Sequence, residues 1–262
     1  MDMCTDNKYE NHKSQRFNEL SPKWDRSAMG KQYISSPAGD KYADFIVNTV
    51  KPYIDEHYNT KPQRQYMGIG GSSMGGIISL YMAIEYSEVF DYGILFSPAM
   101  HVYADDILDK FFNNYDFKSM KSLPRIYLFA GGETGGSDPG TPYEEACITK
   151  YVDITKDNLV SRNYPEQMIG TMIDKNLSHI ESTWAKIFPN ALKWLSDTGG
   201  ISGDVNGDGI LNIRDATEIQ KYNAELVDFN ETQLRLGDLN NDGRVNISDA
   251  TLIQKRVAEI KE

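Results

Sequence analysis

The sequence has few of the features that mark several common protein classes. Only two of its 262 residues are cysteine, Cys4 and Cys147, which is too few for a disulfide framework. No apolar stretch approaches membrane-spanning length, so we expect no membrane partner. The net charge is −11 and no basic run is present, so we expect no nucleic-acid partner. The first twenty residues also lack the hydrophobic core of a signal peptide.

Two copies of one acidic pattern, offset by 34 residues, occupy the last part of the chain. Each copy places oxygen-bearing side chains at positions 1, 3, 5, 9 and 12 of a twelve-residue loop, with glycine at position 6. An EF-hand loop binds Ca²⁺ with this spacing and uses a backbone carbonyl at position 7. We therefore predict two structural calcium ions. Their predicted ligands are Asp204, Asn206, Asp208, Ile210, Asn212 and Asp215 in the first loop, and Asp238, Asn240, Asp242, Arg244, Asn246 and Asp249 in the second.

The repeat continues beyond each loop into a segment with helical periodicity, at residues 215–221 and 249–255. Both loops end in Asp, whereas an ordinary EF-hand loop ends in Glu. Residues 203–262 thus contain two loop–helix units that end their loops in Asp and are joined by a short polar connector. In these features they resemble a type I dockerin. The resemblance implies a cohesin module of a scaffold protein as the partner. It also implies a secreted or cell-surface location, bound to a scaffold that gathers polysaccharide-degrading enzymes.

The same resemblance implies which residues contact the cohesin. In dockerins, loop positions 10 and 11 help to select the cohesin, and the helix beyond them adds basic residues. These two positions differ here from the frequent Ser-Thr pair, so the resemblance indicates the class of partner but not its identity. The matching residues are Ile213, Arg214, Lys221, Ile247, Ser248 and Lys255.

Ahead of this segment, strand and helix patterns alternate, which favours an α/β fold with a mostly parallel sheet covered on both faces. Residues 1–42 show almost no apolar periodicity and are predicted to be loop. Turn-forming residues separate an α/β domain at 1–197 from a linker at 198–202 and a small all-α calcium-binding module at 203–262. The predicted strands are 64–70, 91–97, 125–130 and 167–173, and the predicted helices are 43–58, 74–86, 104–114, 142–163 and 180–195.

The pentapeptide Gly-Ser-Ser-Met-Gly at 71–75 lies between the predicted strand 64–70 and helix 74–86. It matches the G-x-S-x-G turn, in which the glycines prevent clashes and the serine hydroxyl is lifted above the sheet. Ser73 is therefore the predicted nucleophile. The backbone N–H of Met74 is the predicted donor to the oxyanion.

A serine nucleophile needs a base, and the base needs an acid that orients it. Of the four histidines, only His179 lies between the last predicted strand and the last predicted helix of the α/β domain. An α/β-hydrolase places its general base there. The acid should leave the glycine-rich loop after strand 125–130, which offers Glu133 and, as the alternative, Asp138. The order serine, acid, histidine is the α/β-hydrolase order.

Further motifs around the elbow follow one another in a recognisable order. They include Arg-Phe-Asn-Glu-Leu-Ser-Pro at 16–22, Phe-Ser-Pro-Ala at 96–99, and Ser-His at 178–179 with Trp184 beyond. From about residue 16 to residue 195, the chain resembles the esterases of the α/β-hydrolase superfamily that include enterobactin, feruloyl and acetyl-xylan esterases.

The resemblance implies carboxylic-ester hydrolysis by Ser73, His179 and Glu133 through an acyl-enzyme, with no cofactor for catalysis. Together with the dockerin, it implies ester-decorated plant polysaccharide as the substrate. Two alternatives stay open. The chain could be a hydrolase fragment without activity that acts only through its dockerin, or an esterase for another class of ester.

The family pattern also contains segments that this sequence does not show. In that family several strands precede the elbow, and the loop after one of them, usually marked by His-Gly, donates a second oxyanion N–H. Only 72 residues precede Ser73, and none forms such a strand and loop. We therefore expect that the chain begins inside the domain and that strand 64–70 forms an uncovered sheet edge. A chain of this kind should fold poorly or be nearly inactive unless the missing residues are supplied.

Overall fold

The computed structural model describes residues 15–131, 142–174, 176–197, 201–240 and 242–258. The chain forms two compact units. The larger contains Met1–Met120 and Pro124–Leu192, and the smaller contains Lys121–Leu123 and Lys193–Glu262. Within the described ranges, every helix is too short or too polar to cross a membrane.

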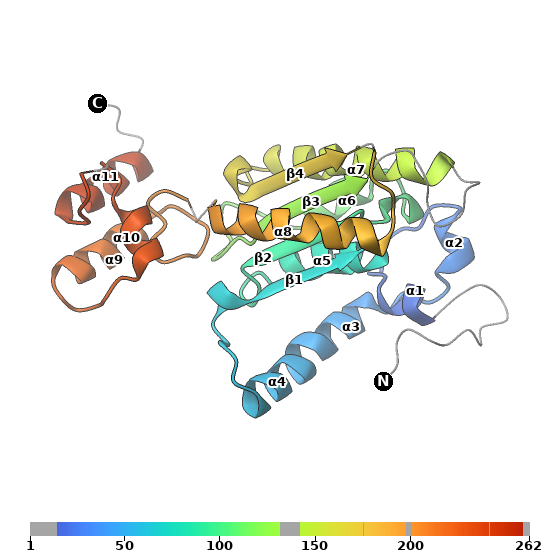
Figure 1. Cartoon of the computed structure of the whole chain (residues 1–262), viewed down its shortest axis with the longest axis horizontal. Coiled ribbons are helices and arrows are strands. Elements are labelled where there is room, and N and C mark those ends of the chain that lie inside the picture. Colours follow the sequence, from blue (N-terminus) through green and yellow to red (C-terminus); the bar gives the residue numbers. More distant parts are fainter. Residues whose placement is uncertain (1–14, 132–141, 175, 198–200, 241, 259–262) are drawn as a thin grey trace. The chain divides into compact units, whose positions relative to one another are not determined.

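A four-stranded parallel sheet forms the centre of the larger unit (Figure 1). The two central strands are almost entirely buried, as expected for apolar runs in a sheet covered on both faces. Ser72 pairs with Phe96 at the ends of neighbouring strands, so the carboxyl ends of the strands share one edge of the sheet. The strands, in their order across the sheet, are β1 (Gly68–Ser72), β2 (Tyr92–Phe96), β3 (Arg125–Gly131) and β4 (Ile169–Asp174).

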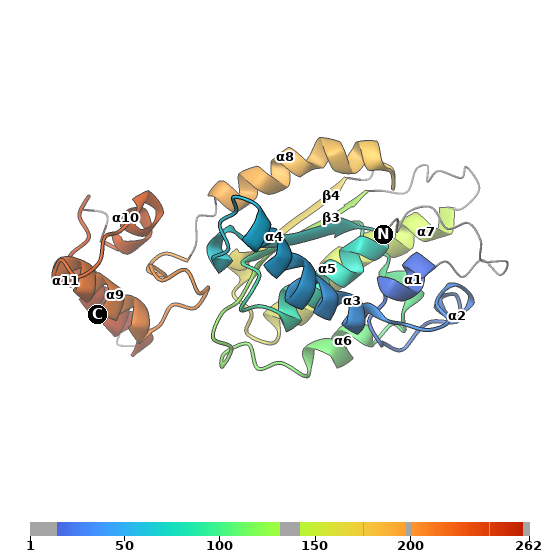
Figure 2. The same cartoon turned by 90° about the horizontal axis from the view of Figure 1, so that it is seen from below.

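Helices cover both faces of this sheet (Figures 1 and 2). On one face lies α8 (Glu181–Asp197). Its Phe188 ring meets the ring of Phe96 in β2 edge to face, with ring centroids 6.3 Å apart. On the other face lie α5 (Met74–Glu85) and α7 (Pro142–Val160). The remaining helices of this unit are α1 (Gln15–Glu19), α2 (Gly30–Tyr33), α3 (Gly39–Phe45), a π-helical turn at Ile46–Val50, α4 (Lys51–His57) and α6 (Ile107–Phe112), with 3-10 turns at Arg64–Tyr66, Met100–Val102 and Glu166–Met168.

The α/β prediction is confirmed, and the differences lie at element ends and in short helices. Residues 64–66 form a helical turn, so the first strand runs from 68 to 72 instead of 64 to 70. The region predicted as loop contains α1, α2 and the start of α3, with 5, 4 and 7 residues in the three helices. Helices this short span two turns or fewer, so no apolar periodicity can reveal them. In the described sheet, β1 is an edge strand.

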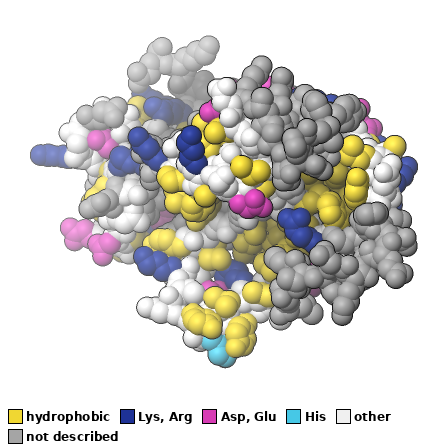
Figure 3. Space-filling model, turned by 45° about the vertical axis from the view of Figure 1, so that its right-hand side comes forward, with side chains coloured by type: hydrophobic (Ala, Val, Ile, Leu, Met, Phe, Trp, Pro, Cys, Tyr) yellow, Lys and Arg dark blue, Asp and Glu magenta, His cyan; other side chains and the backbone are white. Residues whose placement is uncertain are grey.

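Several large apolar side chains between α3 and β1 remain exposed: Phe45, Tyr53, Ile54, Tyr58 and Tyr66. On the face drawn in Figure 3, hydrophobic side chains likewise reach the surface in patches that charged side chains interrupt. Scattered apolar exposure of this kind is normal for a protein surface and marks no binding site by itself.

One buried carboxylate joins the amino ends of three strands. Asp91 is 8% exposed and forms ion pairs with Arg64, before β1, and with Arg125 at the start of β3. Replacing Asp91 with alanine would remove the carboxylate from two largely buried guanidinium groups. We therefore expect the variant to lose about 3–5 kcal/mol of unfolding free energy, measured by urea denaturation.

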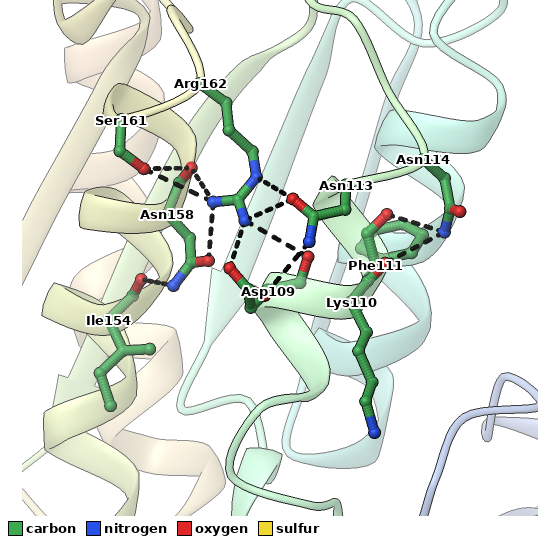
Figure 4. A network of polar contacts seen from close by, with 9 residues as sticks. All are labelled: Asp109, Lys110, Phe111, Asn113, Asn114, Ile154, Asn158, Ser161 and Arg162. Atoms are coloured by element: carbon green, nitrogen blue, oxygen red, sulfur yellow. Dashed lines mark hydrogen bonds and ion pairs between the residues drawn. The ribbon is translucent and has the colours of Figure 1, made fainter.

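A surface carboxylate provides the control for this substitution (Figure 4). Asp109 of α6 pairs with Arg162, but the Asp109 side chain is 59% exposed. The same guanidinium also donates to Asn113 and to Asn158, so it keeps acceptors when Asp109 is removed. Asp109→Ala should therefore change the unfolding free energy by less than about 1 kcal/mol. Equal losses for the two variants would contradict the role given to Asp91.

The smaller unit consists of two similar loop–helix segments with a third helix between them. The first helix, α9 (Ile213–Asn223), and the last, α11 (Ile247–Val257), each begin at an asparagine cap with a reciprocal capping box. Between them lies α10 (Glu231–Gly237). The all-α prediction for this part is confirmed. Its core consists of Val205, Ala216, Ile219, Leu236, Leu239, Ala250 and Ile253.

Candidate functional site

The turn between β1 and α5 holds Ser73 in a strained backbone conformation. Ser73 has a φ of 56° and a ψ of −121°, and a positive φ costs a non-glycine residue roughly 1–2 kcal/mol. Its N–H donates to the carbonyl of Phe96 at 2.9 Å, and its own carbonyl accepts from Gly76 N–H at 3.0 Å. These bonds fix Ser73 at the carboxyl edge of the sheet. Met74 is the first residue of α5, where backbone N–H groups have no acceptor within the helix.

The glycines around Ser73 differ in how strictly the turn needs them. A Cβ on Gly71 would lie 2.5 Å from the carbonyl oxygen of Gly75, whereas a Cβ on Gly75 would meet nothing within 4 Å. The expectation that each glycine prevents a clash is therefore wrong for Gly75.

Substitutions at these two glycines should consequently have opposite effects on stability. Gly71→Ala should disrupt the turn and remove about 2 kcal/mol or more of unfolding free energy, because backbone must move to admit the new carbon. Gly75→Ala should raise it by roughly 0.5 kcal/mol, because alanine favours a helix over glycine. Thermal unfolding of the two variants measures the difference, and equal melting temperatures would contradict this description of the turn.

A second strained serine follows β2 at the same edge. Ser97 has a φ of 44° and is 1% exposed. The register of β1 and β2 places Ser97 and Ser73 at corresponding positions, one residue beyond the ends of neighbouring strands. The Oγ of Ser97 accepts a hydrogen bond from Trp184 Nε1 of α8 at 3.3 Å and lies 3.5 Å from the backbone nitrogen of Gly131. Ser97 therefore connects the ends of β2 and β3 to α8.

The segment after β4 returns to this edge and carries His179. A Cβ on Gly131 would lie 2.4 Å from the carbonyl oxygen of Leu177, so this segment lies directly against the end of β3. The His179 ring meets the Trp184 ring edge to face, with centroids 5.0 Å apart and an interplanar angle of 85°, and its Nδ1 atom is buried. Trp184 also donates a hydrogen bond to Ser97, the residue after β2. His179 therefore lies on the same edge of the sheet as Ser73.

The third predicted catalytic residue is not placed, because Glu133 and Asp138 both lie outside the described residues. A second imidazole, His101, lies on the 3-10 turn after β2. Burial, and to a lesser extent the charge of Lys150, lowers the pKa of His101 below its ordinary value of 6.5. His101 is therefore the imidazole against which a role for His179 has to be compared.

The two acidic loops of the smaller unit have the same internal hydrogen bonds. The glycine at position 6 donates to the carboxylate at position 1 in both, from Gly209 to Asp204 at 2.8 Å and from Gly243 to Asp238 at 2.9 Å. Both glycines have a φ of 82°, which favours glycine and is needed for the sharp turn of an EF-hand loop. The residue at position 9 likewise donates to the carboxylate at position 12 in each loop.

The first loop gathers negative charge in a buried place. Burial, with a smaller contribution from neighbouring carboxylates such as Asp208, raises the pKa of Asp204 to about 6 and that of Asp215 to about 7. Among the described residues, no three His, Cys, Asp or Glu side chains form a ready-made metal cluster. The oxygen-only set of side chains in each loop nevertheless suits Ca²⁺, which takes its ligands from carboxylates, amides and backbone carbonyls.

The six residues predicted to contact a cohesin are all accessible to some degree. Ile213 and Ile247, the first residues of α9 and α11, are 53% and 51% exposed. Two apolar side chains thus reach solvent at equivalent positions of the repeat. The others are exposed or half-buried: Arg214, Lys221, Ser248 and Lys255.

Two family models match the chain. Residues 11–193 match the family described as "Putative esterase", and residues 202–258 match the "Dockerin type I domain". The chain is also 25% identical over 182 residues to the uncharacterized protein YbbA of Bacillus subtilis (strain 168). The aligned region covers 69% of this chain and 69% of YbbA.

Solved structures of similar fold include the siderophore hydrolase EstA from Aspergillus nidulans. It aligns with a TM-score of 0.56 and 16% identity over 74% of this chain and 69% of that chain. A ferulic acid esterase aligns with a TM-score of 0.45 and 14% identity over 68% of this chain and 66% of that one. This chain thus spans about two thirds of the length of each of these relatives. It has an α/β-hydrolase-type fold, belongs to the esterase family matched over residues 11–193, and carries a C-terminal type I dockerin domain.

Proposed function

We propose that this protein is a serine esterase in which Ser73 is the nucleophile and His179 the general base. The observation that carries the proposal is the strained turn at Ser73, which lies at the same edge of the sheet as the His179 segment. A positive φ at a serine between a strand and a helix is the conformation of a nucleophile elbow. The esterase family match supports the same reaction class.

In the proposed reaction, Ser73 Oγ bonds to the acyl carbon of the ester while its proton passes to His179. The oxyanion of the tetrahedral intermediate accepts the N–H of Met74 at the start of α5. His179 then gives the proton to the leaving alcohol as the ester C–O bond breaks, which leaves an acyl group on Ser73. Water attacks this group, its proton passes to His179, and a carboxylic acid leaves as the hydroxyl of Ser73 is restored. Glu133, or Asp138 as the alternative, would orient the imidazole.

We further propose that the substrates are acyl decorations of plant cell-wall polysaccharide. The fold is shared with a siderophore hydrolase, so the fold by itself does not select a polysaccharide substrate. The dockerin favours the polysaccharide, because cohesin-bearing scaffolds gather enzymes around insoluble glycans. The partner would be a cohesin module of such a scaffold, outside the cell.

A substrate panel tests both parts of this proposal. If the proposed function holds, the purified chain releases acid from p-nitrophenyl acetate and from at least one of acetylated xylan and feruloylated arabinoxylan, whereas the second candidate function below predicts no release. His179→Gln should lower the rate by about 10²-fold or more, while the matched His101→Gln should retain it. Equal losses for the two histidine variants would remove His179 as the base. Activity on siderophore esters alone would remove the polysaccharide substrate.

A second candidate function is favoured by one observation. The turn with Ser73 follows β1, which is an edge strand of the described sheet and therefore has less support than a central strand. If this edge strand does not hold the turn firmly enough for catalysis, the hydrolase part is inactive and the chain acts only through its dockerin. A chain that binds cohesin but hydrolyses no ester in the panel would establish this alternative.

For the dockerin we propose two structural calcium ions, one in each loop. In both loops the side-chain oxygens at positions 1, 3, 5, 9 and 12, with the carbonyl at position 7, would hold the ion. Bound calcium would neutralise the buried carboxylates and draw the loop closed, which fixes the helix that follows.

Calcium affinity of the first loop should fall as the pH falls. The pKa values of Asp204 and Asp215, about 6 and about 7 in the fold, lie above the ordinary 3.8. Protonation therefore stabilises the metal-free fold below pH 4, and this stabilisation is lost as the pH rises through 7. Calcium competes with these protons, so its affinity should drop about tenfold per pH unit for each protonated group. Isothermal titration calorimetry between pH 8 and pH 5 measures this, and a pH-independent affinity for both loops would contradict it.

A further inference from the structure

We propose that Ser97 and Trp184 form a positioning pair that holds the His179 imidazole at the carboxyl edge of the sheet. This inference rests on the proposed function, in which His179 is the base. Both residues would act through His179, so they are positioning residues in the proposed reaction.

Ser97 occupies a conformation that glycine would adopt at lower energy. Its φ of 44° costs a serine roughly 1–2 kcal/mol, and glycine has no such penalty. The hydroxyl must therefore supply an interaction that offsets the strain. The buried Oγ accepts from Trp184 Nε1 at 3.3 Å, and no glycine could do so.

This hydrogen bond fixes the indole to the end of β2. The same indole meets the His179 ring edge to face, with ring centroids 5.0 Å apart and an interplanar angle of 85°. Aromatic pairs in this edge-to-face arrangement contribute about 0.5–1.5 kcal/mol beyond the area they bury. The backbone N–H of Trp184 donates a hydrogen bond to the Ile180 carbonyl at 3.3 Å. The indole of Trp184 and the imidazole of His179 therefore belong to one local structure at the start of α8.

The backbone next to His179 is fixed from a second direction. The carbonyl oxygens of Leu177 and Ser178 would lie 2.4 Å and 3.3 Å from a Cβ on Gly131, so this segment cannot approach the end of β3 more closely. The imidazole segment is thus held between the end of β3 and an indole that Ser97 anchors. Because a base must reach the nucleophile within hydrogen-bonding distance, displacement by about 1 Å lowers rates by up to about 100-fold.

Four variants test the pair: Ser97→Gly, Trp184→Phe, the double variant, and Trp194→Phe as the matched control on the same helix. The first two should each lower kcat for an aryl ester by about tenfold or more, with KM within about twofold of wild type. The double variant should be no worse than the poorer single variant, because both changes break one interaction. Ser97→Gly relieves strain but also loses the hydrogen bond from Trp184, so the melting temperature of each variant is recorded and kcat is compared at a temperature where all of them are folded.

Fluorescence tests the same contact without reference to activity. A protonated imidazole quenches an indole that it touches, so the emission of Trp184, isolated by subtracting Trp184→Phe, should rise as His179 loses its proton. His179→Gln should abolish this step, and Ser97→Gly should reduce its amplitude by at least half. Unchanged kcat in both single variants, or an unchanged fluorescence step in Ser97→Gly, would overturn the positioning pair. If the wild-type chain hydrolyses no ester, or if its hydrolysis does not depend on Ser73, the proposed function is overturned instead. The fluorescence result would still decide whether Ser97 and Trp184 position His179.

Discussion

Replacing Ser73 with alanine is expected to lower kcat for ester hydrolysis by about 10⁴- to 10⁶-fold, with little change in KM. The reason is that the variant lacks the atom to which the acyl group would be transferred. Any residual rate would come from binding and from the oxyanion donor at Met74 alone. The measurement is steady-state hydrolysis of p-nitrophenyl acetate, with the unfolding transition recorded to show that the variant is folded.

Ser72→Ala is the matched control, because Ser72 precedes Ser73 in the same turn and belongs to β1. This variant should retain kcat within about threefold, since the first serine of the turn has no part in the proposed transfer. A Ser73→Ala variant that keeps more than a tenth of the wild-type kcat would exclude Ser73 as the nucleophile.

Removing calcium should unfold the dockerin and abolish its binding to a cohesin. Among its described residues the unit has a core of seven buried apolar side chains, which is small for a segment that must fold by itself. An ion present at 1,000 times its dissociation constant stabilises the fold by about 4 kcal/mol, and two loops would add two such contributions. Without the ions, the mutually repelling carboxylates of the first loop oppose folding.

Far-UV circular dichroism with calcium, and then with a calcium chelator, measures this effect. We expect loss of helical signal on chelation, recovery on adding Ca²⁺, and little recovery with equal Mg²⁺, which prefers fewer protein ligands and a smaller site. The rate of ester hydrolysis should be unaffected, because no calcium ligand is proposed in the hydrolase part. An unchanged helical signal and unchanged cohesin binding after chelation would contradict the calcium assignment.

Much of this architecture is readable from the sequence, because it depends on local patterns. The dockerin loops repeat a fixed spacing of oxygen side chains, and both copies fold with the same hydrogen bonds and the same φ at position 6. The buried strands β2 and β3 are short apolar runs bounded by turn residues, and they lie where they are predicted. The turn at Ser73 is predicted by its glycines and by the strand and helix around it.

Other features depend on contacts between segments that are far apart in the sequence. The sequence assigns no role to Ser97 or Trp184, although both stand in motifs that point to the family. Their hydrogen bond joins residues 87 positions apart, and the positive φ of Ser97 has no local signature. The open space beside Gly75 likewise follows only from the tertiary structure.

Whether Ser73 is the nucleophile can be measured directly by covalent labelling with an alkyl fluorophosphonate, followed by peptide mass spectrometry. Such a reagent is attacked by an activated serine and remains bound to it. We expect one adduct, on Ser73, which is absent in Ser73→Ala and formed far more slowly in His179→Gln. An adduct on another residue, or equal labelling of wild type and Ser73→Ala, would contradict the assignment of Ser73 as the nucleophile.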